Sequence, residues 1–368
     1  MPRPLVLVFF GGLLAPSVFS QAPDAVSAQL RANQYDLAGD GKGFLLKEAE
    51  RASFFALGEL HGDNETPALV RDLWPALWRA GYRHVAAEIS PWKADRLQLP
   101  TVSPNEPPGF SWPLADVRFL NSLRPERPVL WGCDMEEGRP DLLIRDWASA
   151  NPRHPGLQAV VERFRDGYRR ALAPELLPLV RGIEGAKDVV VGGGSLRDSI
   201  VATLEIEVDR LSPDTRLSAS MRREALMKST FVARYRGTPG RPKVMARYGR
   251  NHLHRGYDRR GVSTLGNLLA ELAAAENGSS FHVAEFAAGG QVWWGGRRID
   301  ADERSDDPAF ALLTSLASHP ATVFDVRPLR QPLHRIPEAD RSPAVASLVY
   351  WCDSYDAIVC YKQATPIR

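Results

Sequence analysis

The chain has 368 residues, of which 44% are hydrophobic and 24% are charged, a composition that excludes a disordered or fibrous protein. Its 46 basic and 44 acidic side chains nearly balance and no tract concentrates positive charge, so nothing in the sequence favours nucleic-acid binding. The length allows one large α/β domain or two smaller domains.

The first twenty residues have the pattern of a secretory signal peptide. Arg3 gives a short positive start, residues 5–14 (LVLVFFGGLL) are apolar, and Val18 and Ser20 stand at the positions read by a signal peptidase. The apolar stretch is shorter than the roughly 20 residues of a membrane span. We therefore predict cleavage after Ser20, a secreted or periplasmic location and no membrane span in the mature chain. An uncleaved N-terminal anchor is the alternative.

Residues 21–53 form a lead-in segment. Asp36 and Gly41 suggest a calcium-binding EF-hand loop, but Ala38 stands at its third position and Lys47 stands where a bidentate Glu is needed. The pattern instead predicts a turn followed by a helix that begins near Leu45.

Residues 54–368 are predicted to form a single α/β domain with a helical insertion at about 142–240. Apolar runs that alternate with helical patterns indicate βαβ units. The predicted fold class is therefore α/β, with a mostly parallel central sheet flanked by helices and a helical insertion in the middle third. Strands are expected at 54–57, 84–89, 128–131, 243–246, 281–286, 322–326 and 357–361, and helices at 67–80, 264–276 and 307–318.

Three cysteines are present: Cys133, Cys352 and Cys360. An exported protein meets an oxidising compartment, but three is an odd and small number. Cys352 and Cys360 are either a disulfide pair or buried free thiols, and only their geometry decides between the two.

A Gly-x-x-His pattern occurs twice, as Gly58-Glu59-Leu60-His61 and as Gly249-Arg250-Asn251-His252. Each copy follows an apolar run that is typical of a buried strand. Because open α/β folds keep their ligand sites at the carboxyl ends of the strands, the two imidazoles are predicted to share one site.

Carboxylates surround the first copy of the pattern. Glu59 and Glu65 flank His61, and Glu88 closes the strand predicted at 84–89. An unpaired buried carboxylate costs several kcal/mol, so a partner, solvent or a ligand is expected at each. A His beside a carboxylate is held in one tautomer and becomes a better base or metal ligand. The alternatives are a polar loop before a helix for the first segment and a salt bridge for Glu88. Since consecutive strands usually pair, Glu88 is expected near His61.

The second copy lies in a loop rich in Arg. His252 stands among Arg247, Arg250, His254 and Arg255. Such a loop is either a solvated basic surface or a group of cations that neutralises an anionic substrate group or an oxyanion.

Five segments in this order resemble the superfamily of erythromycin-esterase-like and ChaN-like proteins, which includes the Tiki and TraB proteins. They are ALGELHG, VAAEIS, REALMKS, VMARYGRNHLHRG and YDAIVCY, and the resemblance extends from about residue 54 to residue 361. Gly58-Glu59-Leu60-His61 is one residue shorter than the Gly-Glu-x-x-His start of the esterases. The shorter form is that of the ChaN and Tiki branches.

The resemblance implies roles for six residues. His61 and Glu59 match the water-activating pair of the esterases, and His61-Gly62-x-x-Glu65 also looks like the esterase pattern. Glu88 matches the acid at the second strand end, Arg223 with Met227 matches an Arg-x-x-x-Met helix motif, and His252 matches the second His. The catalytic residues predicted from this resemblance are Glu59, His61, Glu65, Glu88, Arg223 and His252.

The predicted function is an exported hydrolase that cleaves an ester or amide bond of a small-molecule or peptide substrate by direct attack of water. One alternative is a metal-dependent peptidase of the Tiki type, with a divalent metal ion held by His61, Glu88 and His252. The other is a haem, iron or small-ligand binding protein of the ChaN type, which needs a His facing a wide apolar slot. The sequence names no certain cofactor and no oligomeric state.

Overall fold

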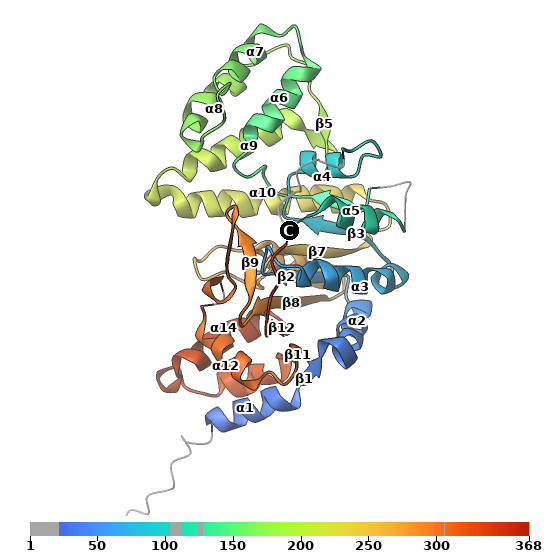
Figure 1. Cartoon of the computed structure of the whole chain (residues 1–368), viewed down its shortest axis with the longest axis vertical. Coiled ribbons are helices and arrows are strands. Elements are labelled where there is room, and N and C mark those ends of the chain that lie inside the picture. Colours follow the sequence, from blue (N-terminus) through green and yellow to red (C-terminus); the bar gives the residue numbers. More distant parts are fainter. Residues whose placement is uncertain (1–21, 104–111, 124–127, 305, 368) are drawn as a thin grey trace, which may run out of the picture.

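An eight-stranded sheet forms the centre of the molecule in the order β1-β11-β12-β8-β2-β7-β3-β4 (Figure 1). The computed structural model describes residues 22–103, 112–123, 128–304 and 306–367, so the predicted signal peptide lies outside the described residues. The six strands from β12 to β4 run parallel, and β11 is antiparallel to both β12 and β1. The sheet strands are β1 (Gln34–Asp36), β2 (Phe54–Glu59), β3 (Tyr82–Ala87), β4 (Leu130–Gly132), β7 (Lys243–Gly249), β8 (Ser280–Ala287), β11 (Ala321–Asp325) and β12 (Ala357–Tyr361).

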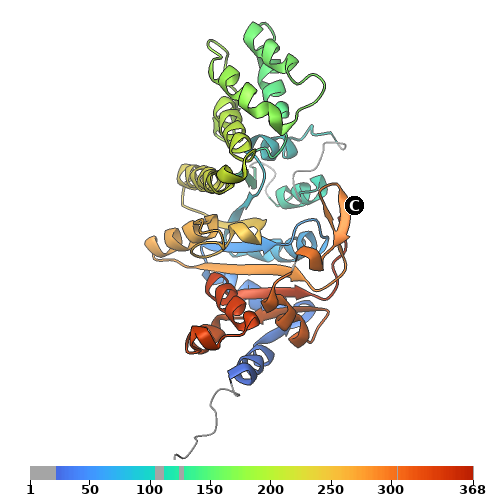
Figure 2. The same ribbon diagram turned by 90° about the vertical axis from the view of Figure 1, so that its left-hand side faces the viewer.

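Helices cover both faces of this sheet (Figure 2). Successive side chains of β2 point to opposite faces, so Phe54 and Ala56 enter one hydrophobic core and Phe55 and Leu57 enter the other. The first core is closed by α1 (Ala22–Ala32), α10 (Arg216–Gly237), α11 (Leu265–Ala275), α12 (Pro308–Leu316) and α14 (Pro343–Ser354). The second is closed by α2 (Lys42–Arg51), α3 (Glu65–Arg79), α4 (Pro91–Leu97) and α5 (Leu114–Asn121). The predicted α/β class with a mostly parallel, helix-flanked sheet is confirmed.

The middle third of the chain is helical, as expected, and has a hydrophobic core of its own. It contains α6 (Pro140–Ala150), α7 (Pro155–Glu162), α8 (Ala173–Arg181), α9 (Leu196–Asp209) and the long helix α10. In Figure 1, α6 to α9 lie on the far side of α10 from the sheet. The Gly192-Gly193 pair is the turn of a small hairpin of β5 (Val190–Val191) and β6 (Gly194–Ser195), where both glycines have positive φ.

Several boundaries differ from the predicted ones. The strand β2 continues to Glu59 and β3 ends at Ala87, so Glu88 follows its strand rather than closing it. The helix predicted from Leu45 begins at Lys42, after a short π-helical turn. Helix α14, strand β1 and the hairpin of β9 (Gln291–Trp294) and β10 (Arg297–Asp300) had no counterpart among the predicted elements.

The expected pairing of the first two strands of the domain is wrong. Strand β7, which follows the insertion, lies between β2 and β3 and pairs with both. Adjacency of consecutive strands is a tendency of about two-thirds of cases, and here the chain returns to the centre of the sheet instead.

The three cysteines are buried free thiols, so the disulfide alternative for Cys352 and Cys360 does not hold. Among the described residues, no helix has the length and hydropathy that a membrane crossing requires.

Candidate active site

The two Gly-x-x-His segments leave neighbouring strands at the same edge of the sheet. Strands β2 and β7 are parallel, and Glu59 at the end of β2 is in register with Gly249 at the end of β7. The residues that follow both strands therefore meet although almost two hundred positions separate them in the sequence.

The glycine of each segment makes room for the other segment. A Cβ on Gly58 would lie 2.8 Å from Cα of Arg250, and a Cβ on Gly249 would lie 2.3 Å from Nε2 of His61. Both are closer than a side chain tolerates, so these two positions accept only glycine without a shift of the neighbour. This is the physical reason for the repeated pattern.

His61 has an unusual backbone conformation, with φ of 72°, and Gly62 follows at φ of 78°. The left-handed region costs a residue with a side chain of order 1 kcal/mol, and such residues gather at functional sites. A Cβ on Gly62 would lie 2.0 Å from the carbonyl oxygen of Trp293. The imidazole of His61 stacks on Trp294, with ring centroids 5.9 Å apart, so the hairpin of β9 and β10 fixes its orientation.

Glu59 holds His61 by its Nδ1 atom. One carboxylate oxygen lies 2.5 Å from Nδ1 of His61, and the other accepts a hydrogen bond from Nε of Arg247. Burial by itself would raise the pKa of Glu59, but Arg247 and His61 outweigh it and hold the pKa below its usual value. Because Glu59 is a carboxylate, Nδ1 of His61 is the donor and Nε2 faces away from Glu59.

Glu224 holds His252 in the same manner. Its Oε1 atom accepts a hydrogen bond from Nδ1 of His252, and its Oε2 atom accepts one from the backbone N–H of Leu265 at 2.9 Å. Burial would lower the pKa of His252, but the carboxylates of Glu88 and Glu224 raise it to about 10. His252 is therefore an imidazolium at neutral pH.

Glu88 joins the two histidines. Its Oε2 atom lies 3.5 Å from Nε2 of His61, and its Oε1 atom lies 3.4 Å from Nε2 of His252. The same oxygens accept hydrogen bonds from the backbone N–H of Gly249 at 2.7 Å and from Nη2 of Arg223 at 2.8 Å. Burial would raise the pKa of Glu88, but His252, His61 and Arg223 hold it well below its usual range. The proximity of Glu88 to His61 agrees with expectation, although β7 rather than direct strand pairing produces it.

Arg223 is anchored on a second buried carboxylate. Its Nε atom lies 3.0 Å from Oδ1 of Asp134, and its Nη2 atom reaches Oδ2. Asp134 and Glu224 were not among the predicted site residues. Asp134 follows the end of β4, so the rule that found Glu88 also applies to it, whereas Glu224 lies on a helix whose packing the sequence does not reveal.

Glu65 is placed elsewhere than predicted. Its carboxylate accepts hydrogen bonds from the backbone N–H of Thr365 at 3.0 Å and from its hydroxyl at 2.7 Å. Within the described residues, it makes no hydrogen bond or ion pair with Glu88 or with either histidine. Five of the six predicted residues lie together in the structure, whereas the sixth, Glu65, is hydrogen-bonded to the C-terminal segment.

Two of the arginines around His252 are paired with acids. Arg247 lies within β7 and is buried on Glu59, and Arg255 in the loop pairs with Asp356, which also pairs with Arg330. His254 is buried, and burial lowers its pKa to about 3.

A further group of buried acids lies beside Glu59. Glu285 is fully buried, its Oε1 atom accepts a hydrogen bond from Tyr361 and its Oε2 atom lies 2.8 Å from the hydroxyl of Thr66. The same hydroxyl lies 3.1 Å from Asp63. Burial and the nearby Asp63 raise the pKa of Glu285 to about 8. When Glu285 is protonated, its carboxyl O–H donates to the hydroxyl of Thr66, and that hydroxyl donates to Asp63. Each of these three side chains then has a hydrogen-bond partner.

The donor set does not fit a metal ion in this arrangement. Among the described residues, no group of three His, Cys, Asp or Glu side chains is placed to hold one. Both carboxylate oxygens of Glu88 already accept hydrogen bonds, one from the backbone N–H of Gly249 and one from Arg223.

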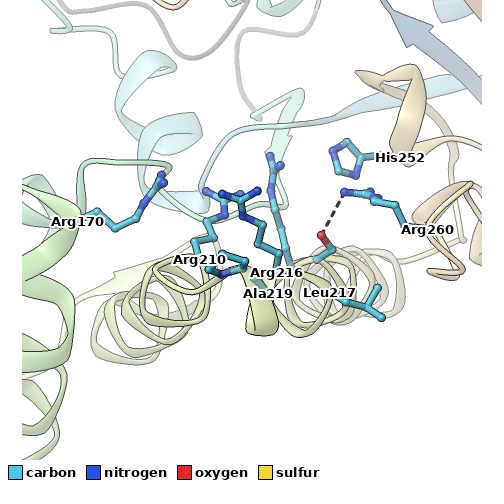
Figure 3. A pocket seen from close by; sticks show the side chains of 10 residues that line it. Arg170, Arg210, Arg216, Leu217, Ala219, His252 and Arg260 are labelled. Atoms are coloured by element: carbon cyan, nitrogen blue, oxygen red, sulfur yellow. Dashed lines mark hydrogen bonds between the residues drawn. The ribbon is translucent and has the colours of Figure 1, made fainter. Parts of the chain in front are cut away.

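A cavity of about 660 Å³ opens beside His252 and Arg223 (Figure 3). The helical insertion and the loop after β7 form its walls. Its lining residues are Arg170, Arg210, Pro213, Arg216, Leu217, Ala219, Ser220, Arg223, His252 and Arg260.

Three solved structures share the fold of this chain. A histidine-to-asparagine mutant of erythromycin esterase EreC in its open conformation is 16% identical with a TM-score of 0.56, over 88% of this chain and 93% of that chain. A succinoglycan biosynthesis protein is 12% identical with a TM-score of 0.54, over 93% and 97% of the two chains. A protein from Bacillus cereus is 13% identical with a TM-score of 0.54, over 93% and 98%.

No protein-family model and no curated protein matches the chain. The resemblance to ChaN, Tiki and TraB proteins stays a prediction. The structural likeness confirms the other part of the resemblance: the chain has an erythromycin-esterase-like fold.

Proposed function

We propose that the chain is an exported hydrolase in which His61 activates a water molecule for attack on an ester or amide carbon. One observation carries the proposal: two histidines, each held at Nδ1 by its own carboxylate, direct Nε2 toward the single carboxylate of Glu88. The hydrogen bond to Glu59 sets the tautomer of His61, which supports the assignment of His61 as the base and of His252 as the cation of one buried site.

His61 has the role of general base. In the neutral form of His61, Nδ1–H donates a hydrogen bond to Glu59 and the lone pair is on Nε2, so Nε2 is the atom that takes a proton from water. The stacked Trp294 and the hydrogen-bonded Glu59 prevent the ring from turning away. General base catalysis of this kind contributes ~10²–10⁴-fold to the rate.

His252 and Arg223 have the role of stabilising negative charge. A pKa of about 10 is too high for efficient proton transfer near neutral pH, but it keeps His252 positively charged. A fixed imidazolium and a guanidinium favour the oxyanion that forms when water attacks a carbonyl group.

A covalent intermediate is not part of this mechanism. The three cysteines are buried, and burial raises the pKa of Cys133 to about 12. Ser195, the serine in the Gly-rich segment, caps α9 by accepting a hydrogen bond from the N–H of Asp198.

Hydrolysis fits the site better than haem or iron binding of the ChaN type. The cavity beside His252 has a wall of arginines, whereas haem needs a wide apolar slot. The erythromycin-esterase-like fold supports the same choice. Export rests on residues 1–20 and is part of the proposal.

The test is a screen of ester and amide hydrolysis with the purified chain, its His61→Ala variant and a His334→Ala control. His334 is half-exposed and pairs with Asp353 away from the site. We expect activity in the wild type and in the control, a loss of ~10²–10⁴-fold in His61→Ala, and no effect of a chelator. Unchanged activity in His61→Ala would remove the mechanism. Loss of activity with a chelator and recovery with a divalent metal would favour the Tiki-type alternative.

A further inference from the structure

The cavity beside His252 presents only positive charge on its walls. Five arginines and His252 line it, and no Asp or Glu does. The imidazolium of His252 adds to this charge at neutral pH. Such a concentration of cations costs energy through mutual repulsion unless anions lie close by.

Carboxylates that do not line the cavity form ion pairs with some of these arginines. Arg170 donates to the fully buried Glu207, and Arg260 donates to the buried Asp258. A guanidinium carries five N–H donors, and each of these contacts uses only one or two of them. The arginines are thus held in place and still have donors for a ligand.

Arg216 lacks such a carboxylate. It begins α10, and within the part of the chain that the structure describes its side chain makes no hydrogen bond or ion pair. Figure 3 shows its side chain directed into the same space as those of Arg210 and Arg170. This end of the cavity therefore has an excess of positive charge.

Glu137 shows how an anion fits between two of these arginines. One of its oxygens accepts a hydrogen bond from Nη1 of Arg210 at 2.9 Å, and the other lies 3.3 Å from Nη2 of Arg223. The carboxylate is half-exposed and is not part of the lining. A planar carboxylate or a tetrahedral phosphate inside the cavity can likewise accept hydrogen bonds from Arg210 and Arg216 through two of its oxygens.

We propose that this cavity binds an anionic group of the substrate through Arg210 and Arg216, so that the substrate is an ester or amide of an acidic molecule. The inference rests on the proposed function, because His252 and Arg223 belong both to the cavity and to the hydrolytic site. The anionic group lies under the helical insertion, and the bond that is cleaved lies toward Glu88. The insertion thus selects the substrate, and the sheet edge carries out the chemistry.

The test is calorimetric titration of the full purified chain with inorganic pyrophosphate and with citrate at constant ionic strength. Arg216→Ala should weaken the binding of at least one of the two probes by about tenfold, the effect of losing one charge-assisted contact. Arg216→Lys keeps the positive charge but cannot form a bidentate contact, so its affinity for the anion should be intermediate. Arg236→Ala removes the same charge from an exposed position of the same helix, outside the cavity, and should bind like the wild type.

Binding of neither anion to the wild type, or equal binding by Arg216→Ala, overturns the inference. Far-ultraviolet circular dichroism of Arg216→Ala verifies that the overall helix content is that of the wild type. The titration needs no turnover, so its outcome is separate from that of the hydrolysis screen. Anion binding without hydrolysis contradicts the proposed function but supports the anion site. Hydrolysis without anion binding supports the proposed function and contradicts the anion site.

Discussion

Gly249→Ala places one methyl group at the point where the two Gly-x-x-His segments meet. Its Cβ would lie 2.3 Å from Nε2 of His61 and 3.3 Å from Oε2 of Glu88, whereas ordinary contact begins at 3.4 Å. The imidazole must therefore withdraw by more than 1 Å, the difference between 2.3 and 3.4 Å. Gly249 has φ of −51° and ψ of 137°, which alanine adopts freely, so the effect comes from this contact and not from backbone strain.

Two consequences are expected. Overpacking of a tight buried site lowers the free energy of unfolding by about 1–3 kcal/mol. Displacement of a catalytic group by about 1 Å lowers kcat/KM by about 10²-fold. The assays are denaturant unfolding and steady-state hydrolysis of the substrate found in the screen.

Gly43→Ala is the matched control, because a Cβ on Gly43 in α2 meets no atom within 4 Å. It should retain activity and should not be destabilised. A folded Gly249→Ala protein with the kcat/KM of the wild type would refute the argument that the two segments depend on each other's glycine.

Two further predictions concern protons. Glu285 has its pKa raised to about 8 from 4.5, so the folded chain holds a proton that the unfolded chain releases, and stability present below pH 4.5 is lost as the pH rises through 8. Glu285→Gln mimics the protonated acid. Between pH 5 and pH 9, its free energy of unfolding should therefore fall by less than that of the wild type, in which each unit of pKa shift is worth about 1.4 kcal/mol. An equal fall in the two proteins contradicts this prediction. For His252, the stability gained from its raised pKa is fully present below pH 6.5 and is lost as the pH rises through 10. Glu224→Gln should lower the pKa of His252 in an NMR titration and reduce kcat, and an unchanged pKa would show that Glu224 does not hold the charge.

Local patterns predict most of the sheet. The apolar runs that lead into Gly58-Glu59 and Gly249-Arg250 are strands of the parallel sheet. Because the carboxyl ends of parallel strands meet at one edge of a sheet, the residues that follow β2 and β7 lie together. The hairpin of β9 and β10 was not predicted, because its residues are mostly exposed and its strands are short. It nevertheless supplies Trp294, which orients His61.

Contacts between distant segments explain the remaining differences. Glu65 resembles a site residue in sequence, but its partner Thr365 is 300 positions away and draws it to the C-terminal segment. Glu224 is indistinguishable from a surface glutamate of α10 until that helix packs against the loop of His252. Strand order fails for the same reason, since β7 reaches the centre of the sheet only after the insertion.

The central claim is that His61 and His252 act as one catalytic unit across Glu88. Its most direct test is kcat/KM for the wild type, His61→Ala, His252→Ala and the double variant. Substitutions of groups that act as a unit have strongly non-additive effects. The double variant should therefore lose about as much kcat/KM as the less active of the two single variants. Losses that multiply in the double variant, or full activity in either single variant, would contradict the shared site.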